Sequence, residues 1–340
     1  MRYPRAMSNP GASGVRQVTV EADDADIRLD RWFRRHHPEL THGRLEQLLR
    51  GGQVRLDGKR AKSGDRVAAG QVIRIPPIKA AQPADKPQRA IAAPPGLVED
   101  LKARIVHRDP LVLALNKPPG LAVQGGSRTS VHVDGLLDAL QFEAKERPRL
   151  VHRLDRDTSG LLVLGRTAGA AAKLAEAFRR RDTTKLYWAI LVGVPKAEKG
   201  RIDLPLAKTA VGRHGRESMA VDHEEGDDAV TDYVVADTVG KHVALVVLRP
   251  LTGRTHQLRA HCAALGTPIL GDTKYGVRPD GEGGLPEAEA GLHLHAARLV
   301  MPHPQSGRLD LFAEPPPHFR STMKAYGFSP PRDVAVVGAR

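Results

Sequence analysis

A proline-rich stretch divides this chain of 340 residues into two parts of unequal size. Residues 75–96 read IPPIKAAQPADKPQRAIAAPPG and show almost no hydrophobic periodicity, which is typical of an extended, semi-rigid linker. A proline-rich ligand for a recognition domain is disfavoured, because no clean P-x-x-P cluster with flanking anchors occurs there. We therefore expect a small domain at residues 18–76, a linker at 77–97, a large domain at 98–325 and a loose tail at 326–340.

The small domain has the pattern of an α/β unit. Residues 27–33 and 45–49 carry apolar side chains at helical spacing, and the second of these helices stops at a pair of glycines. Residues 53–56 and 72–75 predict two short strands, the first of which runs into an Asp-Gly turn.

The large domain combines strands and helices, with strands predominating. Apolar or alternating runs bounded by Pro and Gly predict strands at residues 111–116, 161–165, 186–194 and 242–249. The sequence therefore indicates an α+β fold. A helix is expected after the second of these strands. Thr167 can cap this helix, and three arginines at 179–181 suit its negative C-terminal end.

A second helix is expected at about residues 256–265. Leu258, Cys262 and Leu265 recur there at i, i+4 and i+7, so we expect Cys262 to be a buried core residue rather than a nucleophile. Cys262 is the only cysteine and cannot form an intrachain disulfide, which favours a cytoplasmic protein.

The charge balance favours a polyanionic partner. Fifty-two Lys and Arg against 39 Asp and Glu give a net charge of +13 and a pI near 10.1. Such a balance suits nucleic acid or a membrane surface. No apolar run of about 18 residues occurs, so no transmembrane helix is expected, and the N-terminus lacks the apolar region of a secretory signal.

One acidic residue stands inside a basic loop, LVHRLDRDTSG, at residues 150–160. Arg153 and Arg156 flank Asp155, and an apolar strand follows the loop. The loop could therefore hold a polyanion's backbone while an ionised Asp155 meets the sugar or base as a nucleophile.

The sequence HRLDRDTSG resembles the signature loop of the RluA-type pseudouridine synthases. Four more blocks resemble segments of that family in the expected order: LALNKPPGLAVQGG (113–126), TKLYWAILVG (184–193), LRPLTGRTHQLRAH (248–261) and LHLHAARLVMPHP (292–304). The resemblance covers about residues 100–320. It implies a catalytic domain built on a mainly antiparallel mixed β-sheet with flanking helices, which isomerises uridine to pseudouridine without a metal or organic cofactor.

The resemblance also implies roles for individual residues. Asp155 would be the nucleophile and Arg259 its ion-pair partner, which keeps a buried carboxylate ionised. Tyr187 would stack on the uracil, and its phenol could reach the C5 proton. The implied substrate-binding residues are Arg153, which takes the place of the flipped nucleotide, Leu258, which packs on the other side of the base, and Asn116 and Lys117, which shape the site.

Each of these residues also has a purely structural interpretation. Arg259 fits a surface arginine on an amphipathic helix, Tyr187 fits a core tyrosine and Arg153 fits an ordinary phosphate contact. The histidines near the motifs show no metal-ligand spacing, so structural hydrogen bonds are expected of them.

Residues 28–75 resemble an S4 RNA-binding domain. This resemblance implies a phosphate-gripping face made of Arg31, Arg34, Arg35, Arg44, Arg50, Arg55, Lys59, Arg60 and Lys62. Alternatively, these charges simply solvate an exposed face.

The expected substrate is 23S ribosomal RNA or a large-subunit assembly intermediate, bound by a monomer that does not associate with membranes. The motifs look most like the RluC-type branch of the family, and the RluD-type branch is the alternative. A noncatalytic RNA-binding protein would leave Asp155 unexplained. A glycoside hydrolase is disfavoured because Asp155 and Asp157, two residues apart on a tight turn, rarely face a sugar from opposite sides.

Overall fold

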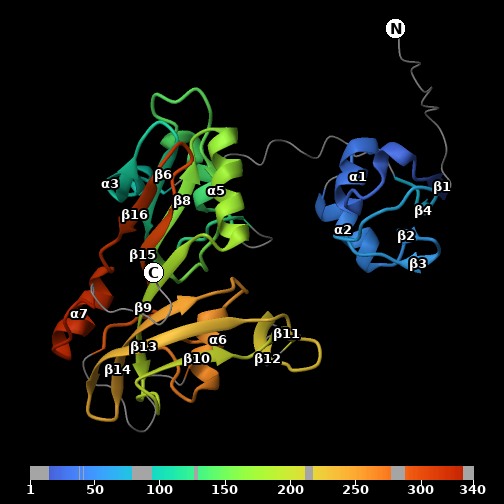
Figure 1. Cartoon of the computed structure of the whole chain (residues 1–340). Helices are drawn as coiled ribbons and strands as arrows, with labels where there is room; N and C mark the ends of the chain where they lie inside the picture. Colours follow the sequence, from blue (N-terminus) through green and yellow to red (C-terminus); the bar gives the residue numbers. More distant parts are fainter. Residues whose placement is uncertain are drawn as a thin grey trace. The chain divides into compact units, whose positions relative to one another are not determined.

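The computed structural model describes residues 15–37, 39–40, 42–78, 94–125, 129–210, 217–276 and 288–331. The chain forms two compact units, Met1–Arg89 and Ala90–Arg340 (Figure 1). Most of the expected linker, 77–97, lies outside the described residues.

The small unit pairs two helices with a four-stranded antiparallel sheet of order β1-β4-β2-β3. Its elements are β1 (Arg16–Thr19), the short 3-10 helix η1 (Ala22–Asp24), α1 (Leu29–His36), α2 (His42–Arg50), β2 (Arg55–Leu56), β3 (Lys59–Arg60) and β4 (Val72–Ile75). Both expected helices and both expected strands are present, whereas the sequence patterns missed the polar strands β1 and β3.

The apolar stripes of the two helices meet over the sheet of the small unit. Trp32 and Phe33 of α1 pack with Leu45 of α2 and Ile73 of β4 in one buried cluster. Full burial of a large apolar side chain contributes about 1.5–3 kcal/mol, so this cluster gives the unit a core of its own. The β2–β3 turn has left-handed backbone at Asp57 and Gly58, the combination that closes a tight hairpin.

The large unit is built on a ten-stranded sheet. Eight strands follow the order β10-β13-β14-β9-β15-β8-β6-β5, while β16 pairs with β15 and β7 pairs with β8. The pairing of β15 with β8 is parallel, and the others are antiparallel. The strands are β5 (Ile105–Arg108), β6 (Val112–Lys117), β7 (Arg149–Leu150), β8 (Ser159–Gly165), β9 (Thr184–Val192), β10 (Lys199–Asp203), β13 (Val230–Val239), β14 (Val243–Pro250), β15 (Leu294–Pro302) and β16 (Arg308–Phe312).

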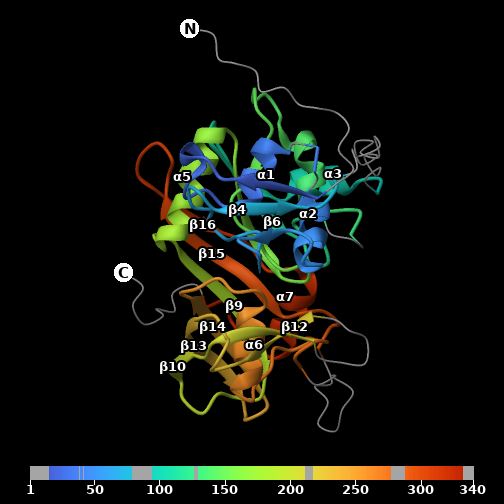
Figure 2. The same cartoon turned by 90° about the vertical axis from the view of Figure 1, so that its right-hand side faces the viewer.

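The other elements of this unit surround the sheet (Figures 1 and 2). They are α3 (Leu97–Ala103), α4 (Val133–Leu136), the 3-10 helix η2 (Leu137–Leu140), α5 (Ala168–Arg180), the β11–β12 hairpin (Leu206–Ala210 and Glu217–Val221), α6 (Gln257–Ala264) and α7 (Pro317–Ala325). The expected α+β class and mainly antiparallel sheet are confirmed.

Helices bury both faces of the sheet. Leu113 and Leu115 of β6 pack with α3 and α4, whereas Val112 and Ala114 of the same strand pack with α5. The same alternation recurs in β14, where odd-numbered residues pack with α7 and even-numbered residues with α6. Burial on both faces explains why these strands are continuously apolar in sequence.

The structure confirms the predicted cap of α5 and the burial of Cys262, but the apolar stripe of α6 is shorter than predicted. The Thr167 hydroxyl accepts a hydrogen bond from the Ala170 amide at 3.1 Å, which confirms the predicted cap. Cys262 is fully buried, as expected, and burial raises the pKa of its thiol to about 12. Leu265 is 37% exposed, because α6 ends before it, so the predicted apolar stripe stops at Cys262.

The C-terminal part of the described chain stays packed beyond α7. Phe328 is buried in the cluster formed by α7 and β14, and Tyr326 packs against the same cluster. Residues 326–328 therefore belong to the large unit rather than to the tail expected from 326. Among the described residues, no helix has the length and apolar character needed to span a bilayer.

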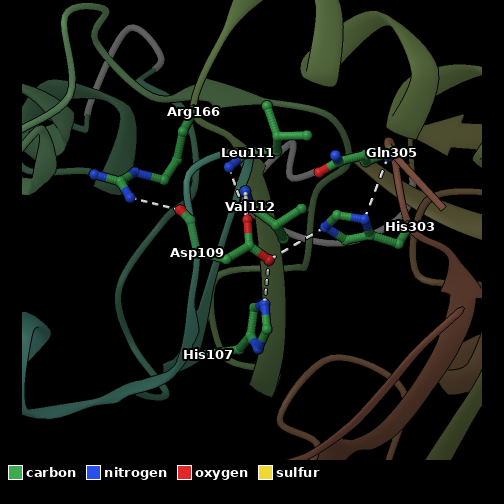
Figure 3. Close-up of polar contacts among 7 residues, drawn as sticks. All are labelled: His107, Asp109, Leu111, Val112, Arg166, His303 and Gln305. Atoms are coloured by element: carbon green, nitrogen blue, oxygen red, sulfur yellow. Dashed lines mark hydrogen bonds and ion pairs between the residues drawn. The ribbon is translucent and has the colours of Figure 1, made fainter. Parts of the chain in front are cut away.

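A carboxylate joins two strands and a turn on the outer part of the large sheet (Figure 3). Asp109 accepts hydrogen bonds from His107 at 2.6 Å, from His303 at 3.2 Å and from the amides of Leu111 and Val112 at 2.7 Å each. His107 belongs to β5, Val112 begins β6, and His303 lies in the turn between β15 and β16. The contact thus fixes that turn to the sheet.

Candidate active site

The loop that carries Asp155 connects β7 to β8 and is anchored at its end by a glycine. Gly160 has φ +110°, and a Cβ there would lie 2.3 Å from the carbonyl oxygen of Ala296 on β15. Only glycine permits this approach, which brings β8 and β15 together as parallel neighbours. The loop therefore ends at a fixed point on the sheet.

Lys117 anchors the loop from the other side. Its fully buried ammonium donates to the carbonyls of Pro118, Leu121 and Arg156, each at 2.9 Å. Burial lowers the pKa of Lys117 to about 7, although the charges of Asp157 and Asp155 act in the opposite direction. Lys117 thus ties the turn after β6 to the loop that carries Asp155.

The loop opens onto a cavity of about 560 Å³. The loop contributes Arg153, Asp155 and Thr158 to its lining, β9 contributes Tyr187, and α6 contributes Leu258, with further residues from the 249–255 turn and the end of α5. Asp155 is the one carboxylate among the described residues that line it. Those residues include seven cations, Arg153, Arg179, Arg181, Lys185, Arg249, Arg254 and Arg259.

Arg259 has a buried partner, Asp272, that the sequence did not predict. Its Nε and Nη2 each donate to a carboxylate oxygen of Asp272 at 2.7 Å, and both side chains are buried. Burial lowers the pKa of Arg259, but the hydrogen bonds and charge of Asp272, with a smaller contribution from Asp155, raise it further than burial lowers it. Arg259 therefore already has a bidentate partner and acts on Asp155 through its charge.

Sequence reasoning missed Asp272. The residue follows Gly271 in a turn after a short apolar run, where a carboxylate has the pattern of a surface turn. Its oxygen Oδ1 also accepts from the amides of Lys274 and Tyr275. Burial raises the pKa of Asp272, yet the Arg259 hydrogen bonds and these two amides bring it below its usual range. The general rule that a buried arginine needs a carboxylate was the available signal.

Tyr187 lies on the α6 side of β9 and faces the cavity. It packs against the cluster that contains Leu258, so the structure brings the two predicted base contacts together. Burial and the negative charge of Asp155 raise the pKa of Tyr187, and the phenol is protonated at neutral pH. The phenol can therefore donate a hydrogen bond.

Two further side chains at the site were not singled out in the sequence. The Thr158 hydroxyl is buried in the cavity wall and has no hydrogen-bond partner among the described residues. Tyr275 places its ring 5.2 Å from the Arg259 guanidinium, and its hydroxyl lies 2.8 Å from Nδ1 of His256. His256 caps α6 with left-handed backbone, φ +51°. A strained cap of this kind is typical of a functional site.

The remaining predicted residues divide into two groups. Arg153 is exposed and lines the cavity. Asn116 and Lys117 do not line it, and Asn116 donates instead to the carbonyl of Glu314 at 2.8 Å. His261, His293 and His295 are buried and hydrogen-bonded, as expected of structural histidines.

All nine basic residues predicted for the small unit are exposed. Arg31 and Arg34 line a hollow of about 410 Å³ together with Phe33. Arg35 pairs with Asp24 at 2.7 Å, and Arg55 donates to the carbonyl of Gly52, which follows α2, and to that of Gly58 in the β2–β3 turn. Some of these exposed cations therefore already have partners within the small unit, and two of them line a hollow that mixes charged and apolar side chains.

Comparison with known proteins agrees with this arrangement. Residues 111–264 match the family described as RNA pseudouridylate synthase, and residues 27–73 match the S4 domain. Ribosomal large subunit pseudouridine synthase C of Escherichia coli (strain K12) is 36% identical over 298 residues, which cover 87% of this chain and 91% of that protein. This chain belongs to the RluA-type family of pseudouridine synthases.

Two other relatives of this pseudouridine synthase differ in length. RNA pseudouridine synthase 4, mitochondrial, of Arabidopsis thaliana is 35% identical over 297 residues, and the match covers 76% of this chain and 62% of that protein. The solved structure of Human RNA Pseudouridylate Synthase Domain Containing 4 is 30% identical with a TM-score of 0.57, covering 69% of this chain and 97% of that one.

Proposed function

We propose that this isomerase converts uridine to pseudouridine in 23S ribosomal RNA, as a monomer in the cytoplasm, with Asp155 as its nucleophile. The observation that carries the proposal is the cavity itself, in which one carboxylate lies among seven cations and beside a tyrosine and a leucine. The large-subunit target rests on the name and the near full-length similarity of the Escherichia coli relative. An RluD-type target is the alternative, and free rRNA or an assembly intermediate would serve as substrate.

The isomerisation needs only chemistry that these residues supply. The C1′–N1 bond breaks, the uracil turns, a C5–C1′ bond forms, the C5 proton leaves and N1 takes up a proton, so the atoms and electrons balance without an oxidant or an added group. A carboxylate can form the transient covalent bond that carries the nucleotide through this exchange. The proposed reaction therefore includes no metal or organic cofactor.

The surrounding side chains hold the nucleotide for this step. Extruding a base from its stack costs a few kcal/mol, and the exposed Arg153 lies two residues from Asp155, where it would fill the vacated position. Tyr187 and Leu258 offer flat and apolar surfaces to the base. The positive charge of Arg259 attracts the Asp155 carboxylate, and this attraction offsets part of the loss of water as RNA covers the site.

The test uses 23S rRNA transcripts carrying tritium at C5 of uridine. Wild type should release tritium, whereas Asp155→Asn should fold, bind the RNA and turn over at less than about a hundredth of the wild-type rate, because it keeps the shape and removes the nucleophile. Turnover by Asp155→Asn above that level would exclude Asp155. RNA binding by wild type without release from any uridine would instead favour a noncatalytic RNA-binding protein.

A further inference from the structure

The cavity extends from Asp155 to a second group of cations at the end of α5. Arg179, Arg181 and Lys185 line this part, together with the aromatic ring of Phe178. The mechanism proposed above uses none of these four side chains. They lie on the end of α5 and the first residues of β9, within the same cavity as the nucleophile.

These cations have no acidic partner of their own. Arg179, Arg181 and Lys185 form no ion pair with any residue in the described parts of the chain, whereas Arg180 between them pairs with Glu176 at 2.9 Å. Burial and the charge of Arg181 lower the pKa of Lys185, so the environment destabilises the charged form of this side chain. A bound anion would offset that cost.

The backbone at Arg181 is also unfavourable for arginine. Arg181 is the C-cap of α5 and has φ +61°, a left-handed conformation that glycine adopts freely and other residues adopt at a cost of about 1 kcal/mol or more. Glycine at this position would end the helix equally well, but it would remove the guanidinium from the cavity.

An aromatic surface adjoins the cations. The ring of His152 stacks on Phe178 with centroids 4.5 Å apart, and its Nε2 accepts the Val163 amide at 2.9 Å. Burial, with the nearby charge of Lys185, lowers the pKa of His152 to about 3, so this ring is neutral and adds no repulsion toward the cations.

Resting on the proposed function, we propose that Arg179, Arg181 and Lys185 form a subsite for a backbone phosphate next to the flipped uridine. Lys185 and Tyr187 occupy positions i and i+2 of β9, so they project from the same face about 7 Å apart. A base stacked on Tyr187 therefore brings a phosphate of its own nucleotide or of a direct neighbour within reach of these cations. Guanidinium and ammonium groups that line one cavity suit the two negatively charged, hydrogen-bond-accepting oxygens of a phosphodiester.

The decisive experiment removes one side of the proposed ion pair at a time, either the phosphate charge of the RNA or a cation of the protein. A short RNA that contains the target uridine is prepared with a single neutral methylphosphonate at each linkage flanking that uridine. Binding and turnover are measured for wild type, Arg181→Gln and Lys185→Met. We expect one methylphosphonate to weaken wild-type binding about tenfold, Arg181→Gln to weaken binding of the natural RNA by a similar factor, and the two changes together to cost no more than either alone. The slope of log K against log salt should be shallower for Arg181→Gln than for wild type, by the contribution of about one phosphate contact.

Two further variants separate recognition from folding. Arg180→Gln is the matched control, because its side chain pairs with Glu176 outside the cavity, and it should bind as wild type does. Arg181→Gly should melt at or above the wild-type temperature, because it relieves the left-handed strain, and yet bind RNA as weakly as Arg181→Gln. If Arg181 only ends the helix and does not contact RNA, Arg181→Gly should bind RNA as wild type does.

The proposal is overturned if Arg181→Gln and Lys185→Met bind the natural RNA as wild type does, or if their losses add fully to that of the methylphosphonate. Because binding is measured apart from turnover, the subsite is tested even if wild type releases no tritium. A wild-type protein that binds RNA but releases no tritium would overturn the proposed function and leave the phosphate subsite standing.

Discussion

At the scale of single residues, the buried pair of Arg259 and Asp272 determines how a cation is held beside Asp155. Both charges are removed from water, so each depends on the other for its stability. We expect Asp272→Asn to lower the free energy of unfolding by about 3–5 kcal/mol, because it leaves Arg259 uncompensated. The exposed pair of Glu176 and Arg180 is the control, and Glu176→Gln should cost less than about 1 kcal/mol.

The acid dependence of this pair follows from the lowered pKa of Asp272. A carboxyl whose folded pKa lies below its unfolded value stabilises the protein fully above about pH 4, and this contribution is lost as the pH falls through the folded pKa. Denaturant unfolding of wild type and Asp272→Asn should therefore converge at low pH. Equal stabilities of the two proteins at pH 7 would contradict the paired arrangement.

Asp155 should also depend on the charge of Arg259 for activity. We expect Arg259→Met to turn over at less than about a hundredth of the wild-type rate, because this variant lacks the positive charge that attracts the Asp155 carboxylate in the cavity. Tritium release at saturating RNA measures this directly. Normal turnover by this variant would exclude Arg259 from the site.

The role of Tyr187 depends on whether its phenol or only its ring is needed. The charge of Asp155 raises the pKa of the phenol, and this contribution disappears when the carboxylate is consumed in a covalent bond. The Tyr187 phenol then gives up its own proton more readily, which it must do before it can accept the C5 proton. We expect Tyr187→Phe to slow that step by about a hundredfold or more and to accumulate a rearranged adduct. Near-normal turnover would leave stacking as the residue's only role.

At the scale of elements, Asp109 links β5, β6 and the turn between β15 and β16. The Nδ1 of His303 accepts the Gln305 amide at 3.2 Å, so Nε2 carries the proton that is donated to Asp109 (Figure 3). Partial burial raises the pKa of Asp109, but the hydrogen bonds from His107 and from two backbone amides lower it below its usual range. The carboxylate is therefore ionised whenever the protein is folded near neutral pH.

We expect Asp109→Asn to lower the free energy of unfolding by about 1.5–3 kcal/mol at pH 7, the usual contribution of hydrogen bonds to a charged group. Because the folded pKa is lowered, the difference from wild type should shrink as the pH falls through that pKa. Asp100→Asn, which removes an exposed helix pair with Arg104, is the control and should change stability by about 0.3–0.5 kcal/mol. A difference for Asp109→Asn that grows in acid would contradict this role.

Elements were predictable from sequence where local chemistry determines them. The strands β6 and β9 are apolar because both of their faces are buried, and α5 begins where Thr167 supplies a cap. The strands β10 and β13 were missed, because β10 reads KGRID and β13 ends in exposed polar residues. The pairing of Arg259 with Asp272 was missed for a different reason. It depends on a turn 13 residues farther along the chain, which only the tertiary fold brings back to α6.

At the scale of the whole molecule, each of the two units has a hydrophobic core of its own. Residues between Val18 and Ile78 form one buried cluster, and the clusters of the large unit are formed by residues between Leu97 and Phe328. The nine exposed basic residues of the small unit contribute nothing to the core of the large one. Truncation can therefore test whether the first unit recognises phosphates independently of the second.

We expect deletion of residues 1–89 to leave the large unit folded and to weaken its binding to 23S rRNA. Each phosphate contact that is lost should lower the slope of log K against log salt by about 0.7 to 0.9. The melting temperature of the large unit and a salt titration of rRNA binding measure the two effects. In the full-length protein, replacing Arg31, Arg34 and Arg50 together with glutamine should lower the slope in the same direction without truncation. If the salt slope stays unchanged in both proteins, these arginines do not contact RNA and only solvate the surface of the small unit.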